Sequence, residues 1–292
     1  MCARAQPGPG EQPPAFSAAA GHYGEDVFRP EQTGEDDRID LGALTYDDVT
    51  MARLRYLGAG PGWRCLDVGA GTGTIAKRLL HEAGVAAVLA VDRDVRFLAA
   101  HPLPGLAVME SDITAPDFRP GRFHLVHARF VLMHLPARRR LITELAELLS
   151  PGGVLVLSDA VDLTTATAPP TPYTRVMQAM WQGLRESIGT DVSWVLDYPH
   201  LLRAAGLGSV GAEIQVPPLA PGSPISRFWS GTWDRARQAI VATGLVDDVA
   251  VDEAVRYLHS PDCADLSPGM ITAWGWRSTD PLHEDSVGSA EL

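Results

Sequence analysis

The stretch "LDVGAGTGTIAKRLL", residues 66–80, reads as an apolar strand, a glycine turn and an amphipathic helix. The strand begins as "RCLDV", residues 64–68, and ends at Gly69. Glycines in such a turn let the backbone approach a ligand, and the N–H groups that open the helix can bind an anionic group. Several unrelated nucleotide-type ligands use turns of this kind. The stretch therefore predicts a strand–turn–helix unit and leaves its ligand open.

Strands and helices continue to alternate on the carboxyl side of this unit. Apolar runs predict strands at 87–92, 106–110, 123–128 and 154–159, and helical spacing predicts short helices near 95–100 and after Pro136. Two stronger helices follow at 172–188 and 194–205, and two late strands at 209–216 and 270–276. This order predicts an α/β protein with a doubly wound, mostly parallel seven-stranded sheet.

About fifty residues separate the two late strands, too many for a hairpin loop. The apolar residues of this intervening segment recur at helical spacing and include several aromatics: Ile225, Phe228, Trp229, Trp233, Ala236 and Ile240. We expect helices over 224–259 that join helix 172–188 in a cap over the carboxyl edge of the sheet. Trp181, Trp229 and Trp233 are candidates for an apolar acceptor pocket, although aromatic residues at helical spacing more often form plain core.

Composition narrows the class of protein. The 292 residues carry a net charge of −12, which disfavours nucleic acid and anionic membrane as partners. No apolar run approaches a membrane span, no leader sequence is apparent, and the three cysteines lack metal-ligand spacing. We therefore expect a soluble cytoplasmic protein. The basic run Arg138–Arg140 is expected to form a solvated helix face.

Three classes of nucleotide site compete for the glycine turn. A P-loop is excluded because no "GK[ST]" follows. A dinucleotide site is harder to exclude, since Asp92 ends a strand and could bind a ribose diol. However, the turn reads G-x-G-x-G-T, so Thr74 stands where a dinucleotide fingerprint has its third glycine. Asp67 before the turn, Asp112 after strand 106–110, and "PGG" before strand 154–159 favour a third class.

The third class is suggested by an ordered set of motifs. "LDVGAGTG", Asp92, "SDI" at 111–113 and "LLSPGGVLVLSD" at 148–159 resemble those of class I S-adenosylmethionine-dependent methyltransferases. The resemblance is strong over roughly residues 60–160 and weak as far as 277. "HARFVLMHLP", residues 127–136, also resembles small-molecule methyltransferases of quinone biosynthesis and bacterial natural products. The resemblance implies the Rossmann-like methyltransferase fold, with S-adenosyl-L-methionine as cofactor and S-adenosyl-L-homocysteine as product.

The resemblance also implies roles at the methionine end of the cofactor. Asp67 would order the loop or engage the amino group, and His127 would lie near that amino group, through its backbone. The structural alternatives are a turn-capping Asp67 and a buried, hydrogen-bonded His127. The turn residues would pass along the methionine part: Gly69, Ala70, Gly71 and Gly73.

At the other end of the cofactor, Asp92 would bind the ribose hydroxyls. Arg93 would pack near the adenine, and Asp112 with Ile113 would hold it. Tyr23, from the segment before the sheet, completes the expected cofactor-binding set.

A sulfonium cofactor carries an activated methyl group, so the protein mainly aligns a nucleophile. A general base is needed only for an acceptor that is protonated at working pH. His134 and Tyr173 are the predicted catalytic residues, with a packed or helix-capping role as the alternative for His134. Less favoured candidates are Asp159, Asp162, His22 and Tyr23. No metal is expected, because no third oxygen ligand accompanies the two aspartates.

We expect the chain to divide into five parts. These are a disordered tail at 1–20, an arm and helix at 21–60, a cofactor-binding α/β core at 61–162, a cap with the last two strands at 163–278, and a flexible tail at 279–292. The segment 22–57 suits a mobile cover over the cofactor, and packing on the sheet edge is the alternative.

The expected function is methyl transfer to an oxygen or nitrogen nucleophile of a small molecule, in bacterial specialised metabolism. Two alternatives remain open: a non-methylating, cyclase-like enzyme that binds the same cofactor, and a cofactor-binding regulatory module. The oligomeric state is also open, with a homodimer as one possibility.

Overall fold

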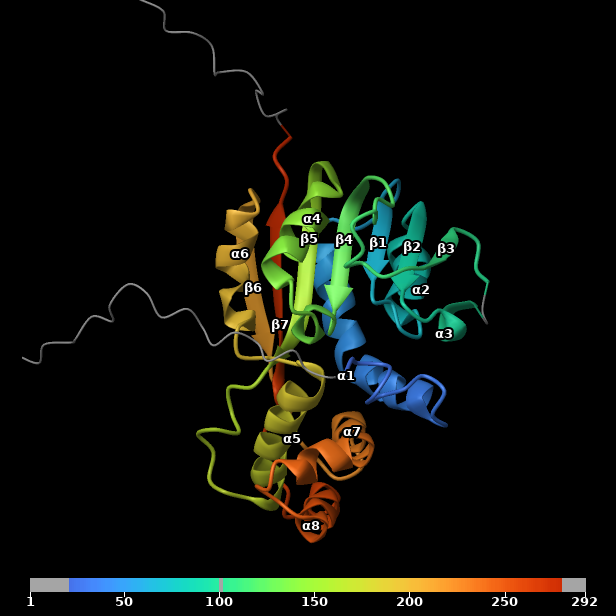
Figure 1. Cartoon of the computed structure of the whole chain (residues 1–292). Helices are drawn as coiled ribbons and strands as arrows, with labels where there is room; N and C mark the ends of the chain where they lie inside the picture. Colours follow the sequence, from blue (N-terminus) through green and yellow to red (C-terminus); the bar gives the residue numbers. More distant parts are fainter. Residues whose placement is uncertain (1–20, 100–101, 280–292) are drawn as a thin grey trace, which may run out of the picture.

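One seven-stranded sheet organises the computed structural model, which describes residues 21–99 and 102–279. Its strand order is β3-β2-β1-β4-β5-β7-β6, and β7 runs antiparallel to both of its neighbours (Figure 1). The first five strands are parallel, as predicted for a doubly wound sheet. The strands are β1 (Arg64–Val68), β2 (Ala87–Asp92), β3 (Leu106–Glu110), β4 (Phe123–Arg129), β5 (Leu149–Val161), β6 (Gly208–Gln215) and β7 (Gly269–Trp276).

Helices cover both faces of the sheet and its carboxyl edge. The helices are α1 (Glu35–Tyr56), α2 (Thr74–Arg78), α3 (Arg96–Ala99), α4 (Arg138–Glu147), α5 (Pro172–Ile188), α6 (Tyr198–Ala204), α7 (Pro224–Ala242) and α8 (Asp248–Leu258). In Figure 1, α5, α7 and α8 lie together below the carboxyl ends of the parallel strands. This confirms the expected helical cap.

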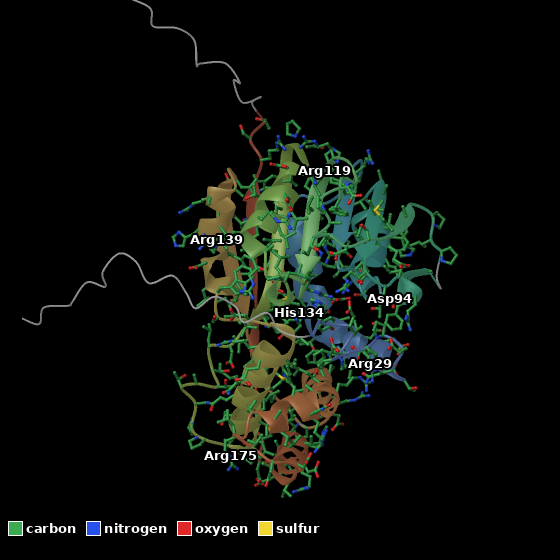
Figure 2. All side chains as sticks on the ribbon, viewed as in Figure 1. Arg29, Asp94, Arg119, His134, Arg139 and Arg175 are labelled. Carbon is green, nitrogen blue, oxygen red and sulfur yellow. The ribbon has the colours of Figure 1, made fainter. Side chains whose placement is uncertain are left out.

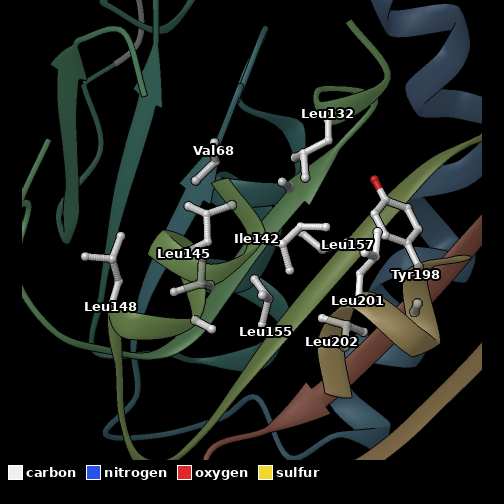
Figure 3. Packing of buried hydrophobic residues seen from close by; sticks show 14 of the residues in the cluster. Val68, Leu132, Ile142, Leu145, Leu148, Leu155, Leu157, Tyr198, Leu201 and Leu202 are labelled. Carbon is white, nitrogen blue, oxygen red and sulfur yellow. The ribbon is translucent and has the colours of Figure 1, made fainter. Parts of the chain in front are cut away.

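The alternation of side chains along the strands builds a core on each face. Successive residues of a strand point to opposite faces, so Leu66 packs into one core and Cys65 into the other. The Leu66 core receives α4 and α6, and Figure 3 shows Ile142 and Leu145 of α4 packed near Leu155 of β5. The Cys65 core receives apolar residues of α1 and α2. The two cores hold the strand ends in fixed positions.

The cap has its own apolar core, contributed by α5, α7 and α8. Gly183 lets α5 and α7 approach closely, because a Cβ there would lie 2.4 Å from the Ala239 carbonyl oxygen. Both helices begin at hydroxyl N-caps followed by proline, at Thr171 and Ser223. The expected helical stretch 224–259 is two helices, since the chain turns after α7 and restarts where Asp247 caps α8.

Several predicted bounds shift in the structure. β5 starts at Leu149 instead of 154, because a bulge between its pairs Phe123↔Leu149 and Leu125↔Val154 accommodates the "PGG" turn. The helix expected over 194–205 is a 3₁₀ turn at Val195–Asp197 followed by α6. The predicted tails 1–20 and 279–292 lie outside the described residues, apart from Thr279. Among the helices of the described ranges, none combines the length and apolarity that crossing a membrane requires.

Candidate active site

A cavity of about 770 Å³ lies between the carboxyl edge of the sheet and the cap. One part, here called the sheet-edge half, is lined by Asp67–Ile75, Asp92–Asp94, Ser111–Thr114 and His127. The other, the cap half, is lined by Tyr23, Phe28, Arg38, Tyr46, Phe130, Met133, His134, Met180, Trp181, Phe228 and Trp229. In Figure 2, His134 and Asp94 are labelled where the sheet meets the cap.

The glycine turn is held in place by backbone hydrogen bonds to the end of β2. The Gly69 and Ala70 N–H groups both donate to the Val91 carbonyl oxygen, at 2.8 and 3.1 Å. Gly69 has φ +63°, and a Cβ there would lie 2.3 Å from Cγ2 of Val131. Two causes therefore oppose any residue with a side chain at position 69: the positive φ, and the clash of its Cβ with Val131. The turn leaves an open cradle facing the cavity.

Asp92 links the turn to the end of β2. Its Oδ2 accepts a hydrogen bond from the Gly71 N–H at 2.9 Å, and its Oδ1 accepts one from the Asp94 N–H at 3.2 Å. Burial raises the pKa of this carboxyl. The neighbouring Arg93 forms an ion pair with Glu25, which ties the N-terminal segment to the sheet edge. All five residues line the cavity.

The segment after β3 contributes a short polar turn. The exposed Asp112 accepts hydrogen bonds at Oδ1 from the Thr114 N–H and Oγ1, at 2.8 and 2.7 Å. Ile113 is half-buried and packs against the α4 side of the sheet core. Both Asp112 and Ile113 line the cavity beside Asp92. The three predicted cofactor residues from β2 and β3 therefore meet at one edge.

Asp67 and His127 form a buried pair beneath the turn. They are register partners on β1 and β4, and His127 Nδ1 lies 2.7 Å from Asp67 Oδ1. Among the described residues the hydrogen-bond partner of the Asp67 carboxylate is His127, and no turn N–H donates to it. His127 Nε2 is buried without a hydrogen-bond partner in the described part of the chain. A buried polar atom without a partner is uncommon and marks a place where a ligand group can bind.

The cap half presents a wall of three aromatic side chains, which we call the aromatic panel: Trp181, Trp229 and Phe228. The ring centroids are 6.1 Å apart for Trp181 and Trp229, and 4.9 Å apart for Trp229 and Phe228. Both indole N–H groups are anchored, from Trp181 to Asp162 at 2.9 Å and from Trp229 to Ser267 at 2.8 Å. Trp233 is buried in the cap core outside the cavity lining, as plain core packing predicts.

The structure adds a polar cluster that the sequence did not indicate. Arg38 of α1 is buried and donates to Glu35 from Nε at 2.9 Å, to Thr232 from Nη1 at 3.2 Å and to the Tyr23 hydroxyl from Nη2 at 3.2 Å. Arg235 of α7 also donates to Glu35, at 2.7 Å. Only the tertiary contact of α1 with α7 distinguishes Glu35 and Arg38 from an ordinary surface pair three residues apart on a helix.

Of the two predicted catalytic residues, one reaches the cavity. His134 lines it, with Nδ1 at 2.8 Å from Thr190 Oγ1 and its ring centroid 4.2 Å from that of Tyr23. Burial, and then the charges of Arg38 and Arg138, lower the pKa of His134 to about 3. The ring is therefore neutral near pH 7.

Tyr173 is not placed where it could act on a substrate, so the catalytic role predicted for it is withdrawn. It is fully buried in the cap, its hydroxyl donates to the Leu266 carbonyl oxygen at 3.3 Å, and it is absent from the cavity lining. The inward-facing position on α5 results from the helical period that places Val176 and Met180 on the same face.

The less favoured candidates separate in the same way. His22 lines the cavity, whereas Asp159 lies behind it, bound to the Tyr198 hydroxyl, and burial raises the pKa of Asp159 to about 7. Asp162 supports Trp181 by accepting a hydrogen bond from its indole N–H.

Within residues 21–99 and 102–279, no three potential metal ligands come together. The expected solvated face at 138–140 is wrong for Arg138, which is buried and pairs with Asp191 at 3.1 Å.

Comparison with known proteins identifies the core. Residues 66–157 match the family model described as a methyltransferase domain. Methyltransferase str3 of Strobilurus tenacellus is 38% identical over 98 residues, which are 33% of this chain and 35% of that protein. Trans-aconitate 2-methyltransferase of Deinococcus radiodurans is 36% identical over 95 residues, 32% of this chain and 36% of that protein. The match thus spans about a third of each relative's length.

The fold extends beyond the matched sequence. The structure of Haemonchus contortus phosphoethanolamine N-methyltransferase 2, in complex with phosphomonomethylethanolamine and S-adenosylhomocysteine, superposes with a TM-score of 0.55 at 16% identity. The superposition covers 86% of this chain and 60% of that one. At this identity the likeness concerns the fold alone.

Proposed function

We propose that the protein is a class I S-adenosylmethionine-dependent methyltransferase that transfers a methyl group to an oxygen or nitrogen nucleophile of a small molecule, a proposal supported by the match of residues 66–157 to a methyltransferase domain. We place that reaction in bacterial specialised metabolism. The observation that carries the proposal is the single cavity that joins the glycine turn to the aromatic panel. A cofactor at the sheet edge and an acceptor under the cap would share one space, as methyl transfer requires.

The residues of the sheet-edge half fit S-adenosylmethionine. Asp92 offers carboxylate acceptors for a ribose diol, and Gly69, where a Cβ would clash with Val131, presents its backbone to the cavity. Asp112 and Ile113 stand where an adenine would be held, with Arg93 nearby. The unpartnered Nε2 of His127 suits a polar group at the methionine end. Tyr23 lies in the cap half, so we now propose that it faces the acceptor as well as the cofactor.

When bound, S-adenosylmethionine supplies an activated methyl group on a sulfonium centre. The chain itself orients the acceptor and keeps water out. The aromatic panel forms a fixed apolar wall, because the indoles of Trp181 and Trp229 are hydrogen-bonded in place. The neutral ring of His134 accepts a hydrogen bond from the molecule that receives the methyl group, and so orients that molecule. The lowered pKa of His134 makes this ring a weak general base.

The proposed division of the chain follows these roles. Residues 61–162 form the cofactor-binding core, residues 163–278 form the cap and the last two strands, and residues 21–60 form an arm and helix over the cavity. The arm contacts both halves of the cavity, through Glu25 to Arg93 and through Tyr23 to Arg38. We propose that it acts as the mobile cover.

Calorimetry tests the cofactor assignment directly. S-adenosylhomocysteine and S-adenosylmethionine are expected to bind the full chain, and NAD and NADP are expected not to bind. Tight binding of NAD would overturn the proposal. With an acceptor in hand, one equivalent of S-adenosylhomocysteine per product distinguishes methyl transfer from a cyclase-like reaction or a purely regulatory role.

A further inference from the structure

We infer that the acceptor is a planar aromatic acid whose ring lies against the aromatic panel and whose anionic oxygens bind Arg38 and Tyr23. The inference rests on the proposed function, since it names the class of molecule that the cap half receives. It depends on three features of that half: an excess of buried positive charge, hydrogen-bond donors without acceptors, and a rigid aromatic wall that ends at Arg38.

The first feature is the charge balance of the cluster. Arg38 and Arg235 share a single carboxylate, that of Glu35. No second carboxylate lies within 4.0 Å of either guanidinium among the described residues. One positive charge is therefore left over beside an apolar cavity, where a low dielectric makes it a strong attractant for an anion.

Other charged groups near the cap half do not cancel this excess. Arg129 lines the cavity but pairs with Asp47 at 2.7 Å. Asp162 lies behind Trp181, and its oxygens accept hydrogen bonds from that indole and from Thr165. His134 is neutral, and the charge of Arg38 contributes to the lowering of its pKa, after burial. Glu35 therefore remains the one carboxylate paired with Arg38 and Arg235 among the described residues, and the cluster keeps a net charge of +1 beside the cavity.

The second feature is a pair of unused donors. The Arg38 guanidinium has five N–H groups, and its hydrogen bonds to Glu35, Thr232 and Tyr23 use Nε, one hydrogen of Nη1 and both of Nη2. The second Nη1 hydrogen has no acceptor in residues 21–99 and 102–279. The Tyr23 hydroxyl accepts from Arg38, and its own proton has no acceptor in those ranges either. Both residues line the cavity. Two donors beside a net positive charge call for an anionic oxygen.

The third feature gives the shape of the molecule. Phe228, at one end of the aromatic panel, lies under the Arg38 guanidinium, whose Cζ is 5.3 Å from the ring centroid. Phe28 of the arm faces the same guanidinium from another side, at 4.5 Å. The apolar wall thus leads from Trp181 to the cation. A flat ring with an acidic group at one end matches this sequence of surfaces.

The test uses 1-naphthoate as probe and 1-naphthamide as its neutral counterpart of similar shape. The full chain is saturated with S-adenosylhomocysteine at pH 8, and binding is measured by calorimetry. Naphthoate is expected to bind at least about tenfold more tightly than naphthamide, as for a charge-assisted hydrogen bond. Decanoate, an acid without a ring, is expected to bind at least about tenfold more weakly than naphthoate.

Two substitutions in the cluster should shift naphthoate affinity in opposite directions. Arg38→Gln removes the cation and is expected to weaken binding about tenfold or more, whereas Glu35→Gln removes the neutralising carboxylate and is expected to strengthen it about threefold. Naphthamide affinity should stay within about twofold in both variants. Because either substitution could destabilise the fold, Tyr23→Phe offers a milder variant, with a loss of about threefold or more for naphthoate alone.

The aromatic part of the inference has its own pair of variants. Trp181→Leu is expected to weaken naphthoate and naphthamide equally, about tenfold, while Trp63→Leu, outside the cavity lining, should change neither. Equal binding of naphthoate and naphthamide by the wild-type chain would overturn the inference. So would a shift of the same sign in the Arg38 and Glu35 variants. If S-adenosylhomocysteine itself fails to bind, the proposed function fails instead, and naphthoate can still be titrated alone.

Discussion

The two halves of the cavity are built by different means. In the sheet-edge half, backbone groups and short polar side chains at strand ends define the surface, as at Gly69 and Asp92. In the cap half, large side chains from α1, α5, α7 and the arm define it. The first surface is set mainly by backbone conformation. The second is set by a few side chains and can be altered one residue at a time.

This difference indicates a division between constant and variable chemistry. Backbone conformation at the glycine turn depends on φ values that only glycine adopts readily, so the sheet-edge half tolerates few substitutions. The aromatic panel is held by two indole hydrogen bonds and can be repacked. The predictions below test whether the two halves respond separately.

The largest effect is expected from Gly69→Ala. A side chain there combines a left-handed conformation, which costs about 1–2 kcal/mol, with a clash against Val131, which costs about 1–3 kcal/mol more. We expect the affinity for S-adenosylhomocysteine to fall by more than about a hundredfold in calorimetry. Gly84→Ala is the matched control, since Gly84 has φ +67° and open space around its Cβ position. Normal affinity in a folded Gly69→Ala variant would contradict the cradle.

Asp92→Ala should have the next largest effect. It removes the acceptors proposed for two ribose hydroxyls and also the hydrogen bond from the Gly71 N–H. Charge-assisted hydrogen bonds contribute about 1.5–3 kcal/mol, so affinity for S-adenosylhomocysteine should fall about tenfold to a hundredfold. Asp48→Ala removes a carboxylate from the exposed face of α1 and should leave affinity unchanged. If Asp92→Ala binds normally, Asp92 is not in the cofactor site.

His134 should make stability depend on pH. Its pKa is about 3 in the folded chain and about 6.5 when unfolded, so the unfolded state takes up a proton first as pH falls. The contribution of His134 to the free energy of unfolding should decline below pH 6.5, by about 2 kcal/mol at pH 5. Urea denaturation of the wild-type chain and of His134→Gln at pH 7.5 and pH 5 measures this contribution, as the stability that the wild-type chain loses relative to the variant between the two pH values.

Asp159 opposes this effect and supplies the internal check. Its pKa is about 7 in the folded chain, above the unfolded value, so its contribution to stability grows as pH falls from 7 towards 4. In Asp159→Asn the free energy of unfolding should therefore fall by more between pH 7 and pH 5 than it does in the wild-type chain. An unchanged slope in both variants would show that neither side chain has the shifted pKa.

The smallest effect is expected in the arm, residues 22–34. Its contacts include the exposed ion pair of Glu25 with Arg93, and exposed pairs contribute about 0.2–1 kcal/mol. S-adenosylhomocysteine should slow hydrogen exchange in this segment by only several-fold, and more strongly in residues 67–74. Identical exchange in the arm with and without ligand would mean that it is edge packing and not a cover.

Sequence patterns predicted the sheet and its edge well, because local signals determine both. Strand 64–68, the glycine turn and Asp92 lie where expected, since a strand followed by glycines and a helix has few alternative geometries. Parallel strands also bring their carboxyl ends to one edge. Asp92, Asp112 and His127 could therefore be placed together without knowledge of the tertiary packing.

The cap half could not be predicted to the same degree, because helical periodicity does not say which neighbour a buried face meets. Trp229 and Trp233 both recur at helical spacing, yet only Trp229 faces the cavity. Tyr173 had the same ambiguity and proved to be core. Arg38 gave no signal at all, since its role depends on Tyr23 and Thr232, residues distant in the chain.

The position of β7 has a consequence for the order in which the protein folds. It is the last strand along the chain, yet it lies between β5 and β6 and supplies both with hydrogen bonds. During synthesis, β6 therefore has no place in the sheet until residues 269–276 have left the ribosome. Until then β5 ends the growing sheet with an unpaired edge, which is a common starting point for aggregation. Closure of the sheet by β7 is thus a late, long-range event.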